Sequence, residues 1–194
     1  MPKLVDHDQY RQQLLIKCFD LFADKGYAAI TMRQIAVGLG VSTGTLYHYF
    51  SSKEVLFEQF IEAMSQRDFA QIATALEAAK TPAERLEIGY AYIADHRDYF
   101  FKQTLIYADF YQYQVSMGGA SDFTRQVNQQ VEKIIIDMLE INDPSIARFV
   151  LAHIDGLILG TLYGEDVDVI KQQAQVMIKL LKNYWQEESW ICHF

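Results

Sequence analysis

The chain has 194 residues, a formal net charge of −8 and 51% hydrophobic residues, with only 3 prolines. This length allows one domain or two small ones with a substantial core, and the scarcity of proline allows long helices almost everywhere. The two cysteines lie at opposite ends of the chain without metal-ligand spacing, which argues against a disulfide framework or a zinc site. We therefore expect an all-α protein with no metal site and no cofactor.

The first predicted helix covers residues 8 to about 24, where apolar side chains recur every three or four residues. Gly26 follows and stops this helix, because glycine adopts the positive φ of a helix C-cap without steric cost. Cys18 falls on the apolar face, so we expect it to be a small core residue.

Residues 31–53, TMRQIAVGLGVSTGTLYHYFSSK, form a pattern of two short capped helices joined by a glycine turn. Thr31 and Gln34 have the spacing of a capping box, so the first of these helices begins at the next residue after Thr31. Gly40 ends it, and Ser42 caps the second helix after a turn of a few residues. Two helices around so short a turn indicate a helix-turn-helix, whose second helix enters the major groove of DNA.

This segment resembles the DNA-binding signature of TetR-family transcriptional regulators, which runs T-x-R-x-I-A, G-V-S, G-T-L-Y-x-Y-F and then S-K-E. The match covers roughly residues 10 to 60. It includes Tyr47, Tyr49 and Lys53, although the fold of a helix-turn-helix does not require these residue types at their positions. The resemblance implies a three-helix DNA-binding domain over residues 1–53 and a helical ligand-binding and dimerisation domain over residues 54–194, with about nine helices in all.

The DNA contacts are predicted from the helix-turn-helix together with this resemblance. The hydroxyl groups of Thr31 and the two tyrosines are expected to donate to phosphate, with Lys53 as the ionic contact. Thr43 stands where the family often has a lysine or another long polar residue, which removes one potential cation. The complete predicted set is Thr31, Arg33, Ser42, Thr43, Gly44, Thr45, Tyr47, His48, Tyr49 and Lys53.

The charge is unevenly distributed along the chain. Residues 1–55 hold six Lys and Arg against five Asp and Glu, whereas the remainder holds eleven against twenty. A mildly positive N-terminal segment on an acidic body suits a protein that turns its body away from DNA.

No window reaches the eighteen or so uninterrupted apolar residues of a membrane span, and residues 1–5 are too short and polar for a signal peptide. We expect a cytoplasmic protein with no membrane partner.

The rest of the chain divides at recognisable start and stop signals. A fourth helix opens after Ser52 and extends into the seventies, and Thr81 followed by proline starts a fifth. Further breaks are predicted at residues 117–121, 142–144 and 164–166. The two helices after the last two breaks carry long apolar stripes. In TetR-like proteins the last two helices form a four-helix homodimer interface, and the alternative is a stripe that packs within one chain.

Residues 90–113 contain nine tyrosines and phenylalanines, a density that suits a pocket for an apolar or aromatic small molecule. Ordinary helix packing with tyrosines at its margin is the equally weighted alternative. His96 also fits a solvated helix end. The predicted ligand-binding residues are Tyr92, His96, Tyr107, Phe110, Tyr111, Phe123 and His153.

Together these patterns predict a homodimeric, ligand-responsive transcriptional repressor. It would bind a palindromic operator in double-stranded DNA and release it when the small molecule binds the C-terminal domain. The alternative is a DNA-binding protein whose body is a protein-interaction module without a small-molecule effector. An enzyme is not expected and no catalytic residue is predicted, because no nucleophile motif, P-loop, dinucleotide fingerprint or zinc-protease helix is present.

Overall fold

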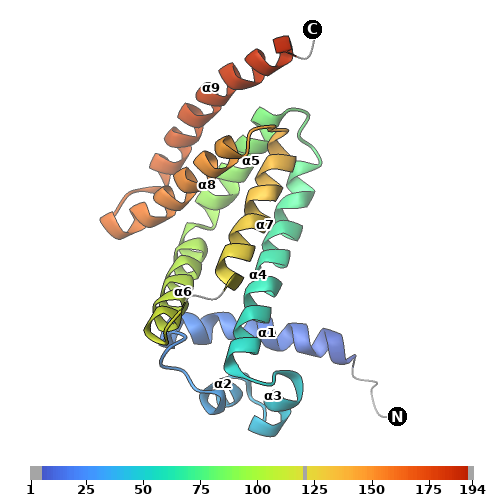
Figure 1. The fold of residues 1–194 in the computed structure, drawn as a ribbon, viewed down its shortest axis with the longest axis vertical. Helices are drawn as coiled ribbons and strands as arrows, with labels where there is room; N and C mark the ends of the chain where they lie inside the picture. The colour runs from blue at the N-terminus through green and yellow to red at the C-terminus, as the bar shows by residue number, and fades with distance from the viewer. Residues whose placement is uncertain (1–5, 120–121, 192–194) are drawn as a thin grey trace. The chain divides into compact units, whose positions relative to one another are not determined.

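The computed structural model describes residues 6–119 and 122–191, which form nine α-helices, one 3-10 helix and no strand (Figure 1). The all-α prediction is therefore confirmed for these residues, while Cys192 lies outside them. The elements are α1 (His7–Lys25), α2 (Met32–Leu39), α3 (Thr43–Tyr49), α4 (Lys53–Leu76), α5 (Pro82–Asp95), α6 (Arg97–Ser116), α7 (Asp122–Leu139), α8 (Pro144–Leu159), the 3-10 helix η1 (Gly160–Tyr163) and α9 (Val167–Ile191).

The helices belong to two compact units that are each discontinuous in sequence. Unit 1 comprises Met1–Ala70 and Lys102–Arg125, and unit 2 comprises Gln71–Phe101 and Gln126–Phe194. Helices α4, α6 and α7 therefore each contribute to both units. The division into a DNA-binding domain (1–53) and a ligand-binding and dimerisation domain (54–194) stays a prediction.

Unit 1 has an aromatic core whose five principal side chains are at most 1% exposed: Phe22, Tyr27, Phe57, Phe60 and Phe110. The ring centroids of Phe57 and Phe110 lie 4.3 Å apart, and that of Tyr27 lies 4.7 Å from Phe57 and 4.8 Å from Phe110. The Phe57–Phe110 pair is stacked and the two Tyr27 pairs are edge-to-face, and contacts of both kinds add to the free energy of burying the rings. They fix α4 and α6 against the loop between α1 and α2.

The helix-turn-helix has the predicted caps. The Thr31 hydroxyl accepts from the Gln34 amide while the Gln34 side chain accepts from the Thr31 amide, and Gly40 takes the left-handed conformation with φ of 70°. Gly38 permits the close approach of α2 to α1, since a Cβ built there would lie 2.5 Å from Leu21 Cδ2. These features explain why so short a helix holds a fixed place against α1.

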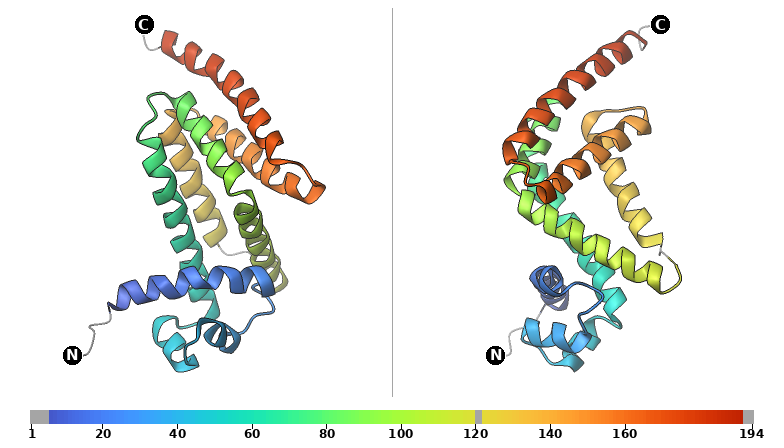
Figure 2. Two further views of the ribbon diagram at one scale, coloured as in Figure 1. Left: turned by 180° about the vertical axis from the view of Figure 1, so that it is seen from behind. Right: turned by 90° about the vertical axis from the view of Figure 1, so that its left-hand side faces the viewer.

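Unit 2 contains α5, α8, α9 and most of α7, and α8 and α9 run antiparallel (Figure 2). Its core includes Tyr90, Leu139, Val150 and Met177, each at most 2% exposed. The predicted proline start is confirmed, because Thr81 accepts from the Glu84 amide and Pro82 opens α5.

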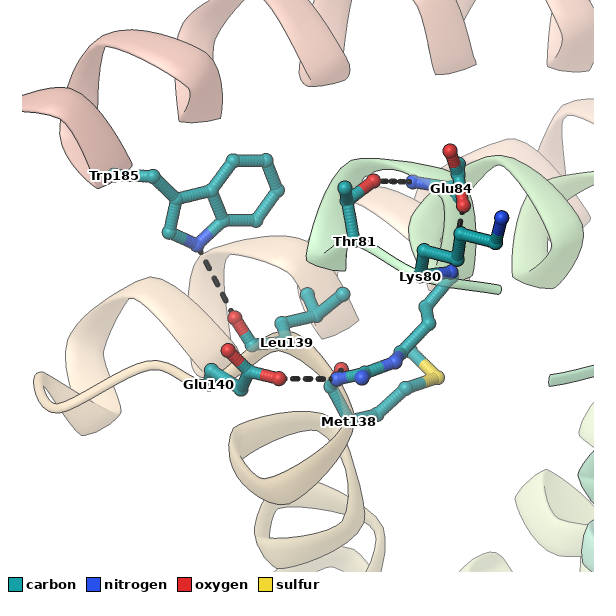
Figure 3. A network of polar contacts seen from close by, with 8 residues as sticks. Lys80, Thr81, Glu84, Met138, Leu139, Glu140 and Trp185 are labelled. Carbon is teal, nitrogen blue, oxygen red and sulfur yellow. Dashed lines mark hydrogen bonds and ion pairs between the residues drawn. The ribbon is translucent and has the colours of Figure 1, made fainter. Parts of the chain in front are cut away.

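The C-terminal end of α7 is held by side chains from two other helices (Figure 3). Arg85 donates to Met138 O at 3.1 Å and pairs with Glu140, and Trp185 donates to Leu139 O at 3.1 Å. Carbonyls at a helix C-terminus lack partners within the helix, so these donors satisfy two of them. The network ties α5 and α9 to α7 and thereby fixes the frame that carries α8.

Candidate nucleic-acid interface

Helix α3 separates buried apolar side chains from exposed polar ones. Leu46 and the following Phe50 are fully buried, whereas the Tyr47 side chain is 52% exposed and Thr43 and His48 are also exposed. The apolar pair fixes α3 against the core of unit 1. Its hydroxyl, phenol and imidazole groups therefore face solvent, as hydrogen-bonding groups that approach DNA must.

The N-terminus of α3 is closed by Ser42, whose Oγ accepts from the Thr45 amide at 2.9 Å and bonds the Thr45 hydroxyl at 2.8 Å. Thr43 and Gly44 lie in this first turn and are exposed. Arg33 is exposed in the first turn of α2, next to the exposed Thr31 cap. The two helix N-termini thus present free amides and small polar side chains, the arrangement that binds phosphate oxygens.

Lys53 is half-buried and binds backbone carbonyls, whereas a side chain that contacts phosphate is expected to be exposed. Its ammonium donates to Tyr27 O at 2.7 Å and Ile30 O at 2.9 Å and lies 4.4 Å from the centroid of the Tyr27 ring. Burial lowers the pKa of Lys53, and the carboxylates of Asp109 and Glu54 oppose this effect. These contacts position the α1–α2 loop, and the phosphate contact stays a prediction.

Asp109 of α6 holds the same loop and was not singled out by the sequence. It accepts from the Ala28 amide at 3.0 Å, and its Oδ2 would lie 2.9 Å from a Cβ at Gly26, whose φ is 71°. An isolated aspartate within a helix gives no sequence signal of such a contact, because its partner lies 81 residues away. Helix α6 is thereby connected to the loop that leads into the helix-turn-helix.

Tyr49 is half-buried and contacts the N-terminal end of α1. Its hydroxyl and His7 Nδ1 share a hydrogen bond of 2.9 Å, and its ring centroid lies 5.6 Å from that of Tyr10. Sequence reasoning did not include His7, since a lone histidine at a helix start has no characteristic pattern. The structure brings it to the recognition helix.

Four of the predicted ligand-binding residues lie in unit 1. Phe110 belongs to the aromatic core, and its ring centroid is 6.4 Å from that of Phe123. Burial raises the pKa of Tyr107 to about 12, against the opposite effect of its hydrogen bond with Ser65. Tyr111 is 50% exposed.

The other three lie in unit 2. The ring centroids of Tyr92 and His96 lie 4.3 Å apart with the ring planes tilted by 34°, and the Tyr92 hydroxyl donates to Gln71 Oε1 at 2.7 Å. His153 Nδ1 shares a hydrogen bond of 2.6 Å with the hydroxyl of buried Tyr90. The predicted set is thus divided between two units. Its role in ligand binding stays a prediction.

Residues 18–60 match the family model described as bacterial regulatory proteins, tetR family. The curated repressor KstR2 of Mycobacterium tuberculosis is 30% identical over 129 residues, which cover 66% of this chain and 64% of KstR2. Residues 18–60 therefore form a TetR-family DNA-binding domain, and most of the chain is similar to a TetR-family repressor.

Solved structures show a likeness of fold over most of the chain. The structure of the M. tuberculosis ketosteroid transcriptional regulator KstR2 is 24% identical and covers 88% of this chain and 93% of its own, with a TM-score of 0.57. A putative transcriptional regulator from Pseudomonas aeruginosa PAO1 is 17% identical over 91% of this chain and 92% of its own, with a TM-score of 0.73. A Saccharomonospora viridis regulator in complex with choline is 19% identical over 89% and 97%, with a TM-score of 0.69. These likenesses establish the TetR fold.

Proposed function

We propose that this protein is a homodimeric transcriptional repressor that binds a palindromic operator and releases it when a small molecule binds. The observation that carries the proposal is the two-sided character of α3. Its polar side is exposed, its apolar side is fully buried, and the helix lies in the segment that matches the TetR-family model. KstR2, which shares 30% identity with the chain over 129 residues, is a repressor, which supports this mode of action.

The proposed contacts to DNA are the N-terminal turns of α2 and α3 and the exposed side chains of α3. Thr43, Tyr47 and His48 are directed to the groove, and Thr31 and Arg33 to the flanking phosphates. Lys53 acts through the loop whose carbonyls it binds. One such domain reads few base pairs, so two copies on a palindrome give the affinity that an operator requires.

The proposed dimer surface is the exposed apolar side of α8 and α9. Phe149 is 51% exposed and Leu159 38% on α8, and Val176 is 48% and Leu180 54% exposed on α9. Exposed apolar side chains that together form a large patch mark an interaction site. The stretch Pro144–Tyr163 is apolar enough by length and composition to cross a membrane, and a second copy of the chain accounts for the same property. One such helix is weak evidence for a membrane span.

The proposed effector site lies in unit 1 at the N-terminal end of α7, at Phe123 and Thr124. Thr124 Oγ1 is buried, and within the described residues it has no hydrogen-bond partner. An unpaired buried hydroxyl is unfavourable, so a ligand that supplies a polar atom there gains free energy. The remaining surface of such a ligand would be apolar or aromatic. That a TetR-fold protein was crystallised with choline supports a small-molecule effector in preference to an interaction module.

In the proposed mechanism the effector shifts α6 within unit 1. Because Asp109 of α6 holds the Ala28 amide, a shift of α6 moves the loop that positions the helix-turn-helix. A coupling free energy of about 1–3 kcal/mol between the two sites changes operator affinity measurably.

The first experiment selects bound fragments from a genomic DNA pool with the purified protein, with Tyr47→Ala and with Met117→Ala. Met117 is 71% exposed on the segment after α6 and serves as the control. We expect one enriched palindrome with the wild type and the control and none with Tyr47→Ala. Absence of enrichment with all three proteins would contradict the proposal.

A compound that binds the protein is then added to the isolated operator complex. Release of the operator supports the effector role. Binding that leaves operator affinity unchanged would leave a repressor without this form of regulation.

A further inference from the structure

A hollow of about 290 Å³, open to solvent, lies within unit 1 between the N-terminal end of α1 and the C-terminal end of α3. It is lined by His7, Asp8, Arg11, His48 and Tyr49. Three of these side chains are basic and one is a carboxylate. The hollow borders the exposed His48 of the recognition helix, so a group bound in it would lie beside any DNA that α3 contacts.

The two histidines lie on facing helices. Their ring centroids are 6.2 Å apart, and His7 Nδ1 shares a hydrogen bond of 2.9 Å with the Tyr49 hydroxyl. Both histidines are exposed, so solvent or a ligand reaches them. Three basic side chains against one carboxylate make this lining suited to an anion.

Arg11 supplies a permanent positive charge to the lining of the hollow. Its Nη2 donates to Gln59 Oε1 at 2.5 Å and its guanidinium carbon lies 5.8 Å from the centroid of the Phe50 ring. Its Nε is buried and, within the described residues, has no hydrogen-bond partner. The charge is therefore held in place while one of its donors remains unsatisfied.

Protonation of His7 changes what the hollow offers to an anion. Neutral imidazole has one donor and one acceptor, so Nδ1 can accept the phenol hydrogen of Tyr49. In the imidazolium form both ring nitrogens donate, so Nδ1 must donate to the Tyr49 oxygen. The phenol hydrogen is then free for a second acceptor, and a full positive charge is added beside it.

We propose that this hollow is a proton-dependent binding site for one phosphate of the DNA backbone, with His7 and Tyr49 as its donors. The inference rests on the proposed DNA-binding function and adds a contact from α1. It predicts that operator affinity increases as the pH falls from 8 to 6, because a phosphate bound beside imidazolium favours the protonated form.

The charged groups around His7 determine the sign of this effect. Asp8 lines the hollow, and Asp6 caps α1 by accepting from the Asp8 and Gln9 amides. Carboxylates and guanidinium groups ordinarily keep their charge between about pH 6 and 8, whereas imidazole is the kind of side-chain group that changes charge in this interval. More protons are bound in the complex than in the free protein. Lower pH therefore favours the complex.

The test measures the affinity of the full-length protein at pH 6 and pH 8 for two duplexes, one with the selected operator and one of unrelated sequence. We expect wild-type affinity to be about tenfold higher at pH 6 for both duplexes, since phosphate contacts carry no sequence information. The His7→Gln variant should bind weakly at both pH values. The His7→Arg variant keeps the charge at all pH values and should bind tightly at both.

The salt dependence supplies a readout that a purely structural role of His7 would not change. The slope of log affinity against log salt should be steeper by about 0.9 for His7→Arg than for His7→Gln at pH 8, the value for one added phosphate contact. Thermal unfolding of each variant shows that the fold is retained.

A pH dependence that persists in His7→Gln and disappears in His48→Gln would overturn the role of α1. Wild-type operator binding that is equal at pH 6 and pH 8 would overturn the proton dependence and leave the proposed function intact. Failure of the wild type to bind either duplex at both pH values would overturn the proposed function itself.

Discussion

Two exposed surfaces of this protein differ in the chemistry of their side chains. Helix α3 exposes hydroxyls, a phenol and an imidazole, whereas α8 and α9 expose Phe149, Leu159, Val176 and Leu180. Groups of the first kind gain from directional hydrogen bonds to phosphates and base edges. Groups of the second kind gain free energy when their apolar area is removed from water. This effect is not directional, so it does not specify a partner, but it favours a partner surface that is equally apolar.

The difference also separates specificity from affinity. In the proposed function, contacts on α3 discriminate between DNA sequences, while contacts on α8 and α9 decide whether two recognition helices act together. Substitutions on the apolar surface should therefore change the affinity for every operator by a large factor. Those on α3 should act more weakly, one contact at a time.

The largest effect is expected from Val176→Glu with Leu180→Glu. These residues are one turn apart on α9 and about half exposed, so the change buries two carboxylates only if a dimer forms. We expect a monomer in analytical ultracentrifugation and a loss of operator affinity of about a hundredfold or more. The Met117→Glu control, an exposed apolar residue of unit 1, should remain a dimer. A double variant that stays dimeric would place the interface elsewhere.

Gly156→Leu also tests the dimer surface, because the substitution is expected to stabilise the fold of the monomer and to weaken the dimer. Gly156 is exposed on α8 and a Cβ built there meets no atom within 4 Å. Leucine should stabilise the helix by about 0.8 kcal/mol relative to glycine. If a second copy packs closely here, the added bulk should weaken the dimer by about 1–3 kcal/mol. Thermal unfolding and the dissociation constant of the dimer measure the two effects, and an unchanged dimer would show that Gly156 lies outside the interface.

The helix-turn-helix was predictable from sequence because its determinants are local. The Thr31 capping box, the Gly40 C-cap and the Ser42 cap each involve residues at most four apart, and all are present. Long helices such as α4 and α5 were also found from their start signals, since Ser52 caps the first and Thr81 the second.

The contacts between distant segments were not predictable. Asp109 binds Ala28 across 81 residues and Lys53 binds Ile30 across 23, and neither pairing leaves a periodic pattern in the sequence. For the apolar stripes of α8 and α9, the periodicity of the sequence predicted which residues share one helix face. It did not predict which part of the protein, or which second chain, packs against that face. The structure divides them, with Val150 and Met177 buried in unit 2 while Phe149 and Val176 remain exposed.

Thr31→Ala tests the fixed geometry of the polar surface. The substitution removes the acceptor for the Gln34 amide at the start of α2. Loss of such a cap costs about 1 kcal/mol, which should appear as a lower free energy of unfolding in urea. Thr31→Ser retains the hydroxyl and should restore most of the stability. Equal stability of the alanine variant and the wild type would show that the capping box contributes little.

Tyr47→Phe should produce the smallest change and separates two roles of one hydroxyl. The side chain is 52% exposed, so loss of the hydroxyl leaves no buried group unsatisfied and should not change unfolding. If the hydroxyl donates to a phosphate, affinity should fall about threefold to tenfold by the same factor for the operator and for unrelated DNA, because a net hydrogen bond contributes about 0.5–1.5 kcal/mol. If it donates to a base edge, the loss should be confined to the operator and the selected sequence should change at one position. Both outcomes assign the polar side of α3 to DNA. Unchanged affinity for both duplexes would instead restrict Tyr47 to contacts through its ring.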